Sequence, residues 1–243
     1  LLLTAGSIEV WTVCSLMLNE IQRIESLLDT CPDFFRLTTL CVVEVDGIRL
    51  PVYGVEVGTQ SGEAPVFSMV GGVHGLERVG CHVALSWLES LAFRLRWDKS
   101  LQHILSKVRV LSVPLVNPGG LYGRTRANPN GVDLMRNAPV EGEDRVSFLV
   151  GGHRISKLLP WHRGDASAME PESQALIDFL QKHSASAPAL MTVDCHSGFG
   201  LKDRLWYPYA KKKGGFPGQD HVDRIVALLE AAHPNHPYVI EPQ

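Results

Sequence analysis

Apolar residues recur along this chain with two different spacings, which predict helices that alternate with strands. Between residues 18 and 28 they recur at helical spacing and predict a first amphipathic helix. Two apolar runs follow, residues 40–45 and 48–57, and Asp46-Gly47 separates them. Because an Asp-Gly pair fits the two-residue turn between antiparallel strands, these runs predict a hairpin.

The rest of the chain repeats an order of strand and helix. Strands are predicted at residues 65–70, 107–116, 189–193 and 238–240, and helices at residues 78–95, 172–183 and 219–232. We expect the apolar run 189–193 to be a buried strand. This order is typical of a single α/β domain over residues 1–243, with a mixed, mainly parallel sheet flanked by helices. The sheet should be antiparallel near its start and parallel later.

Two segments between these elements lack the apolar periodicity of a helix or strand. Residues 118–137 are rich in Gly, Asn, Pro and Arg, which predicts a structured loop at the rim of an active site. Residues 137–171 are predicted to be a long irregular excursion.

The composition is typical of an ordinary globular protein and gives no support for some classes of partner. The 243 residues are 45% hydrophobic and 20% charged, so the chain is long and apolar enough for one large domain with a buried core. A formal charge of −3 gives no electrostatic reason to expect nucleic acid or an anionic membrane as a partner. The oligomeric state stays open.

Cysteine content indicates the compartment. The five cysteines are odd in number and include no Cys-x-x-Cys pair, which favours neither a disulfide framework nor a thiolate metal site. The first seventeen residues lack a basic leader, and no apolar run reaches the ~18 residues that span a bilayer. We therefore expect a cytoplasmic protein.

Two short sequence motifs contain the candidate functional residues. His74 and Glu77 lie in Gly-Gly-Val-His-Gly-Leu-Glu, and His196 lies in Val-Asp-Cys-His-Ser-Gly-Phe-Gly. A spacing of three residues puts His74 and Glu77 on the same side of a turn that enters a helix, so both can reach one ion. Catalytic zinc takes imidazole and carboxylate ligands and leaves one position open. The trio therefore predicts the protein ligands of a single Zn²⁺ ion.

A His-x-x-Glu pair also occurs by chance, so its surroundings decide the interpretation. Each histidine follows a β-like run and is flanked by glycine, where the backbone bends and leaves side chains exposed. In open α/β sheets, ligands gather just beyond the carboxyl ends of the strands. His74 and His196 both lie at such ends, which favours a metal site over two core histidines.

Four motifs follow one another in the order of a known family. They are His74-x-x-Glu77, Asn-Pro-Gly-Gly at residues 117–120, the segment from Arg126 to Asn137 that reads RANPNGVDLMRN, and Asp194-Cys-His196. In this order they resemble the zinc carboxypeptidases of the M14 type over about residues 70–243. The resemblance includes the branch of succinylglutamate desuccinylase-like and aspartoacylase-like proteins.

The resemblance implies a role for each matching residue. His74, Glu77 and His196 match the zinc ligands. Arg126 matches the arginine that polarises the scissile carbonyl, and Arg136 matches the arginine that grips the terminal carboxylate, with Asn137 beside it in the substrate site. A guanidinium suits both roles, because its planar fork binds carboxylates and its charge stabilises an oxyanion. Asp194 is expected either to orient a ligand imidazole or to cap a turn.

Two departures from the family pattern change what we expect of substrate binding and of the general base. Family members often carry asparagine before the carboxylate-binding arginine, where this chain has Met135. We therefore expect a weaker or different grip on a free terminus. The general-base glutamate of the family lies on a late strand, and Glu241 does not match it. The domain is thus expected to lack its last strands, with the base beyond Gln243.

These features predict a zinc-dependent metallocarboxypeptidase that hydrolyses a C-terminal peptide bond through a metal-activated water. Two alternatives stay open. One is a zinc-dependent deacylase of N-acyl amino acids, and the other is a truncated, inactive zinc-binding or ligand-binding fragment. The expected partner is a peptide or acyl-amino-acid substrate with a free carboxylate.

Overall fold

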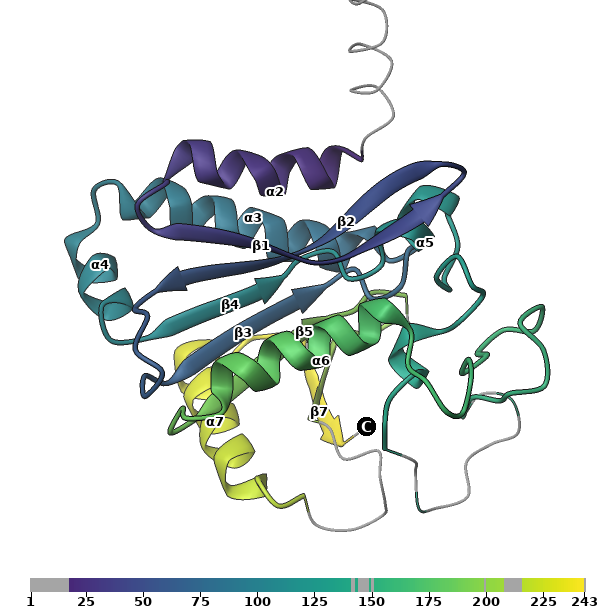
Figure 1. The fold of residues 1–243 in the computed structure, drawn as a ribbon. Helices are drawn as coiled ribbons and strands as arrows, with labels where there is room; N and C mark the ends of the chain where they lie inside the picture. Colours follow the sequence, from purple (N-terminus) through teal and green to yellow (C-terminus); the bar gives the residue numbers. More distant parts are fainter. Residues whose placement is uncertain are drawn as a thin grey trace, which may run out of the picture.

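A mixed five-stranded sheet with strand order β1-β2-β4-β3-β5 forms the centre of the fold (Figure 1). The structure is a computed structural model that describes residues 18–140, 143, 149, 151–198, 200–207 and 216–242. The strands of this sheet are β1 (Phe35–Val45), β2 (Ile48–Gly58), β3 (Val66–Gly71), β4 (Arg109–Val113) and β5 (Leu190–Cys195). β2 pairs antiparallel with β1 and β4, whereas β3 pairs parallel with β4 and β5. The predicted α/β fold with a mixed sheet is confirmed.

The turn between β1 and β2 forms as its Asp-Gly pair predicts. Asp46 and Gly47 have positive φ angles of 51° and 77°. Val45 pairs with Ile48 across the turn. Because a two-residue turn with both φ angles positive follows the twist of the flanking strands, this local sequence sets the register of the hairpin.

Helices cover both faces of the sheet, as predicted. α2 (Asn19–Thr30) and α3 (Arg78–Leu95) lie on one face, and α6 (Pro171–Ser184) lies on the other (Figure 1). The buried stripe of α3 consists of Cys81, Ala84, Leu85, Leu88, Leu91, Ala92 and Leu95. On the opposite face, Phe179 of α6 is only 4% exposed. Gly54 of β2 permits this contact, because a Cβ there would lie 2.9 Å from the Phe179 ring.

Several short elements were not predicted. They are α4 (Lys99–Leu105), β6 (Arg204–Tyr207), and, within the predicted rim loop, α5 (Pro118–Gly123) and the 3₁₀ turn η1 (Leu134–Arg136). Asn117 caps α5, since its side-chain oxygen accepts from the Gly120 N–H at 2.7 Å. Elements this short span too few residues for periodicity to reveal them.

Strand β5 is less buried than the sequence predicts, and that part of the prediction is wrong. Leu190 and Met191 are 45% and 40% exposed. In the described part of the chain, β5 pairs only with β3 and forms the edge of the sheet. Helix α7 (Gln219–Ala232) and strand β7 (Val239–Pro242) form where predicted, and β7 pairs in parallel with β6. No residue of α7 is buried.

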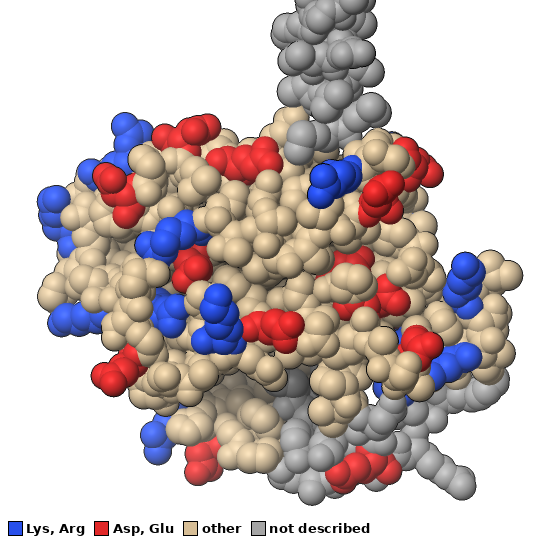
Figure 2. Space-filling view, viewed as in Figure 1, with Lys and Arg blue, Asp and Glu red and all other residues tan. Residues whose placement is uncertain are grey.

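The surface over α6 carries both signs of charge. Figure 2 shows acidic and basic side chains interspersed on this face. Among the helices that the structure describes, none combines the length and apolar character that a membrane span requires.

Candidate metal centre

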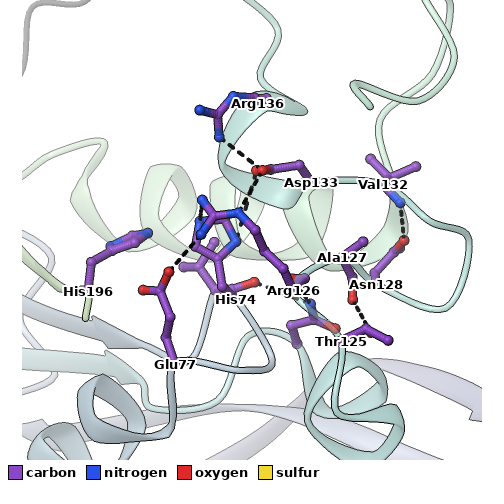
Figure 3. Close-up of polar contacts among 12 residues, drawn as sticks. His74, Glu77, Thr125, Arg126, Ala127, Asn128, Val132, Asp133, Arg136 and His196 are labelled. Atoms are coloured by element: carbon purple, nitrogen blue, oxygen red, sulfur yellow. Dashed lines mark hydrogen bonds and ion pairs between the residues drawn. The ribbon is translucent and has the colours of Figure 1, made fainter. Parts of the chain in front are cut away.

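The carboxyl ends of β3 and β5 lie side by side and bring the two predicted ligand motifs together (Figure 3). In the parallel pairing of these strands, Gly71 lies opposite Cys195. Gly80, in the first turn of α3, packs against the same end, because a Cβ there would lie 1.9 Å from the Cys195 main-chain oxygen. Only glycine lets α3 approach β5 this closely.

His74 lies in the turn between β3 and α3, and it is 1% exposed. Its Nε2 lies 2.7 Å from Nη2 of Arg126, and its Nδ1 lies 3.9 Å from Oδ1 of Asp133. Burial lowers the pKa of His74 to about 3. The ring is therefore neutral at neutral pH and keeps a lone pair that a metal ion can use.

Glu77 stands at the N-terminus of α3 and links the two motifs. Its Oε1 accepts from Nη1 of Arg126 at 2.8 Å, and its Oε2 accepts from the Ser197 main-chain N–H at 2.8 Å. Gly198 follows with a φ of 103°, a conformation that favours glycine. The turn after His196 thus donates a main-chain hydrogen bond to the Glu77 carboxylate.

His196 follows β5 directly, and its ring lies 5.1 Å from that of His74, edge to face. Nδ1 of His196 lies 3.3 Å from Oδ1 of Asp194. Of the two roles expected for Asp194, the structure shows contact with the imidazole. Burial lowers the pKa of His196, but Asp194 and Glu77 outweigh burial and hold it above its usual value. A metal ion at this residue therefore competes with a proton.

Arg126 lies between the predicted ligands. Besides its contacts with His74 and Glu77, its Nε donates to Oδ2 of Asp133 at 3.1 Å. The Arg126 side chain is 36% exposed. Its positive charge therefore stands where the imidazole and the carboxylate converge, at the exposed side of the site.

Asp133 also contacts the candidate site and was not among the predicted site residues. It is 1% exposed, and its Oδ2 accepts from both Nε of Arg126 and Nη1 of Arg136, the latter at 2.9 Å. One buried carboxylate thus holds both predicted substrate arginines. The sequence does contain a signal for this role, because Asp133 is the only acidic residue in the segment 126–137, which also contains Arg126 and Arg136. A charged side chain that becomes buried needs partners of opposite charge.

Asn137 and Met135 flank Arg136 and differ in exposure. Asn137 is 4% exposed, its Nδ2 donates to the Arg163 main-chain oxygen at 2.9 Å, and its Oδ1 accepts from the Glu170 N–H at 2.7 Å. These bonds use the Asn137 side chain to hold the loop, and its contact with substrate stays a prediction. Met135 is 37% exposed.

Glu241 lies in β7, away from the ligand motifs in sequence and sheet. It forms an ion pair with Arg204, and its Oε1 accepts from Nε1 of Trp206 at 3.0 Å. The Trp206 hydrogen bond and Arg204 hold the pKa of Glu241 below its usual value. A carboxylate with a lowered pKa is a weaker base. That Glu241 does not supply the general base stays a prediction.

The residues fit a zinc ion by their chemistry. Two imidazoles and one carboxylate form a donor set of catalytic zinc, and Nδ1 of His74 is buried without a hydrogen-bond partner among the described residues. Within the same residues, no three His, Cys, Asp or Glu side chains are grouped closely enough to hold an ion. Arg126 faces Nε2 of His74 and Oε1 of Glu77, which leaves Nδ1 of His74 as the imidazole nitrogen without a partner among the described residues.

Comparison with known proteins decides the family. A family model described as zinc carboxypeptidase matches residues 22–239, from within α2 into β7. The chain belongs to the zinc carboxypeptidase family. The family expected from the four motifs is therefore confirmed.

Several curated carboxypeptidases are similar to this family member. Carboxypeptidase SOL1 of Arabidopsis thaliana is 27% identical over 171 residues, which cover 66% of this chain and 30% of that protein. The carboxypeptidase N catalytic chain of Rattus norvegicus is 30% identical over 200 residues, which cover 74% of this chain and 41% of that protein. The chain spans less than half the length of the curated relatives it matches.

Solved structures of carboxypeptidase type share the fold. Bovine thrombin-activatable fibrinolysis inhibitor, in complex with tick carboxypeptidase inhibitor, matches with a TM-score of 0.70 at 19% identity, over 93% of this chain and 75% of that one. Carboxypeptidase A from Helicoverpa armigera matches with a TM-score of 0.66 at 18% identity, over 90% of this chain and 55% of that one. At these identities the likeness concerns the fold alone.

Proposed function

We propose that this zinc carboxypeptidase family member is a zinc-dependent metallocarboxypeptidase that hydrolyses a C-terminal peptide bond. The observation that supports it best is the single buried carboxylate of Asp133, which holds Arg126 and Arg136 next to the predicted ligands His74 and Glu77. A C-terminal peptide presents a carbonyl and a free carboxylate close together. Two arginines fixed by one carboxylate beside a metal site match that pair of groups.

Each residue of the site then has a separate role in this reaction. His74, Glu77 and His196 would hold the zinc ion, which when bound polarises a carbonyl and lowers the pKa of its water to about 7. Arg126 donates to the carbonyl oxygen as negative charge develops there. Arg136, fixed through Nη1 by Asp133, binds the terminal carboxylate. Among the described residues, none is assigned as general base.

Zinc content and peptide hydrolysis test this proposal together. Purified protein should hold about one zinc ion per chain, measured by mass spectrometry of the metal. His74→Ala and His196→Ala should abolish zinc binding, whereas His221→Ala, an exposed histidine of α7, should not. Blocked dipeptides with a free terminus should be cleaved. Zinc content unchanged in His74→Ala would rule the proposal out.

A second candidate function keeps the ion and changes the substrate. Met135, exposed beside Arg136, cannot donate the hydrogen bond that asparagine gives in many family members. This favours a deacylase of N-acyl amino acids as the alternative. The ratio of kcat/KM for blocked dipeptides to kcat/KM for N-acyl amino acids separates the two activities.

A chain that binds zinc without hydrolysis is the third outcome. The relatives it matches are more than twice as long as the part it covers. Hydrolysis by residues 1–243 alone excludes this outcome. Zinc binding by the chain with no hydrolysis of either substrate class supports it.

We also propose a reducing, cytoplasmic compartment. The described cysteines, Cys31, Cys41, Cys81 and Cys195, are free, and burial raises the pKa of the Cys81 thiol to about 12. Such a thiol is largely unreactive at neutral pH. Recovery of the protein in a secreted fraction would contradict the proposal.

A further inference from the structure

The loop of residues 151–165 packs against the segment that carries Arg136. Two main-chain bonds establish this arrangement. The Arg163 N–H donates to the His153 oxygen at 2.8 Å and closes the loop on itself. The Asp133 N–H donates to the His162 oxygen at 2.8 Å and fixes the loop to the site. The loop is therefore part of the framework around the two substrate arginines.

Arg163 contacts both residues of the Arg136-Asn137 pair. Its Nε donates to the Arg136 main-chain oxygen at 3.2 Å, and its own main-chain oxygen accepts from Nδ2 of Asn137 at 2.9 Å. The two arginine stems also meet at Gly152. A Cβ on Gly152 would lie 2.7 Å from Cγ and Cδ of Arg163 and 3.2 Å from Cδ of Arg136. Both arginine stems therefore pack against the main chain at Gly152.

Arg154 fixes Arg163 in turn. Nη1 of Arg154 donates toward the main-chain oxygens of Arg163, Gly164 and Asp165, at 3.2, 2.7 and 2.8 Å. Gly164 has a φ of 76°, so the backbone turns sharply at the point that Arg154 holds. The main chain at Arg163 is thus held by a side chain of the same loop.

From these contacts we infer that Arg163 is a positioning residue for Arg136. Asp133 holds the Arg136 guanidinium through Nη1, and Arg163 holds the Arg136 main chain and packs with the Arg136 stem against Gly152. Between them they set the direction of the guanidinium fork. Recognition of a carboxylate by such a fork depends on its angle as well as its position. The inference rests on the proposed role of Arg136 as the carboxylate-binding group.

Removal of the Arg163 guanidinium alone tests the inference. Arg163→Met keeps most of the stem and removes the Nε donor. At saturating zinc, KM for the best blocked dipeptide should rise about tenfold while kcat changes less than about twofold, because the loss lies in binding. Arg49→Met, which removes an exposed arginine of β2 far along the chain from the site, should leave both constants unchanged.

A double-mutant cycle separates positioning from direct contact. If Arg163 acts through Arg136, then Arg163→Met should raise KM no further in an Arg136→Met background. Equal, additive effects in both backgrounds would mean that Arg163 touches substrate or acts on the fold, and the inference would be wrong. Thermal unfolding of each variant shows whether the fold is kept.

Binding of an N-acyl amino acid to zinc-free protein keeps the test independent of turnover, including turnover by the alternative deacylase activity. Calorimetry should show that Arg163→Met weakens binding of an N-acetyl amino acid about tenfold and leaves binding of its amide unchanged, because the amide lacks the carboxylate. This result without peptide hydrolysis would overturn the proposed function and keep the inference. Hydrolysis with an additive cycle would overturn the inference alone.

Discussion

The main-chain N–H of Ser197 donates to Oε2 of Glu77 at 2.8 Å, across 120 positions of sequence. This bond joins the second predicted ligand to the residue that follows the third. Because the donor belongs to the main chain, most side chains at position 197 leave it in place. The bond therefore couples α3 to the end of β5 at the candidate metal centre.

Ser197→Pro should weaken zinc binding, since proline has no N–H to donate. We expect affinity to fall about tenfold, the usual cost of losing a group that orients a ligand. Competition with a chromophoric chelator measures it. Ser197→Ala keeps the N–H and should bind zinc like the unchanged protein. Equal affinity in both variants would show that the bond does not support the ligand.

Gly80→Ala should separate α3 from β5. The added Cβ would lie 1.9 Å from the Cys195 oxygen, which is main chain and cannot rotate away. The free energy of unfolding should fall by about 3 kcal/mol, as for overpacked cores, and zinc affinity should fall with it. Gly62→Ala is the matched control, because no heavy atom lies within 4 Å of its added Cβ. Urea denaturation compares the two, and an unchanged midpoint for Gly80→Ala would contradict the contact.

Asp133→Asn should disturb both arginines that are proposed to bind substrate, Arg126 and Arg136. The amide keeps the shape of the carboxylate but loses the charge that Arg126 and Arg136 share. We expect kcat/KM to fall about 100-fold and the free energy of unfolding to fall by about 3 kcal/mol, because two cations lose their common partner. Asp178→Asn, on the exposed side of α6, should change neither value. An Asp133→Asn enzyme with unchanged kcat/KM would separate this carboxylate from substrate binding.

Glu20→Gln should lower stability in a manner that depends on pH. Glu20 is 1% exposed, and its Oε1 accepts from Nη2 of Arg78 at 2.5 Å and lies 2.9 Å from Nε2 of His82. Burial raises the pKa of Glu20, but the hydrogen bonds from Arg78 and His82 outweigh burial and bring it below its usual value. The folded carboxyl thus binds a proton more weakly than the unfolded one. Its stabilisation is complete above its unfolded pKa and is lost as pH falls through the lower folded pKa.

The corresponding measurement is urea denaturation at two pH values. At neutral pH, Glu20→Gln should lower the free energy of unfolding by about 2 kcal/mol, the range for hydrogen bonds to a charged group. The difference should shrink as pH falls below the unfolded pKa and through the lower folded pKa, because the carboxyl then becomes protonated in both states. Glu44→Gln, an exposed residue of β1, serves as control. A difference independent of pH would contradict the ionic role of Glu20.

Local patterns in the sequence predicted the parts of the molecule that depend on local geometry. The Asp46-Gly47 turn and the His74-x-x-Glu77 pair at the start of α3 belong to this class, because their spacing alone determines where their side chains can lie. The burial of β5 was predicted incorrectly, since it depends on which elements flank the strand. An apolar run does not contain that information.

Long-range polar contacts were the other part that the sequence could not predict. Asp133 acquires its role by accepting from two arginines, and Arg163 acquires its contacts through main-chain atoms of a distant segment. In the described part of residues 137–171, hydrogen bonds to the backbone connect residues far apart in sequence, and such bonds leave no periodic pattern. Residue type alone does not reveal such bonds.

The two predicted histidine ligands follow strands that differ in how many neighbouring strands they pair with. His74 follows β3, which is paired on both sides, whereas His196 follows β5, which in the described part of the chain is paired on one side only. Edge segments open locally at a lower free energy than the whole domain. Fraying of β5 would withdraw one ligand and leave two. The residence time of a metal ion at the candidate centre should therefore depend on the rate at which β5 opens. Variants that release the ion faster should also show faster amide hydrogen exchange in β5.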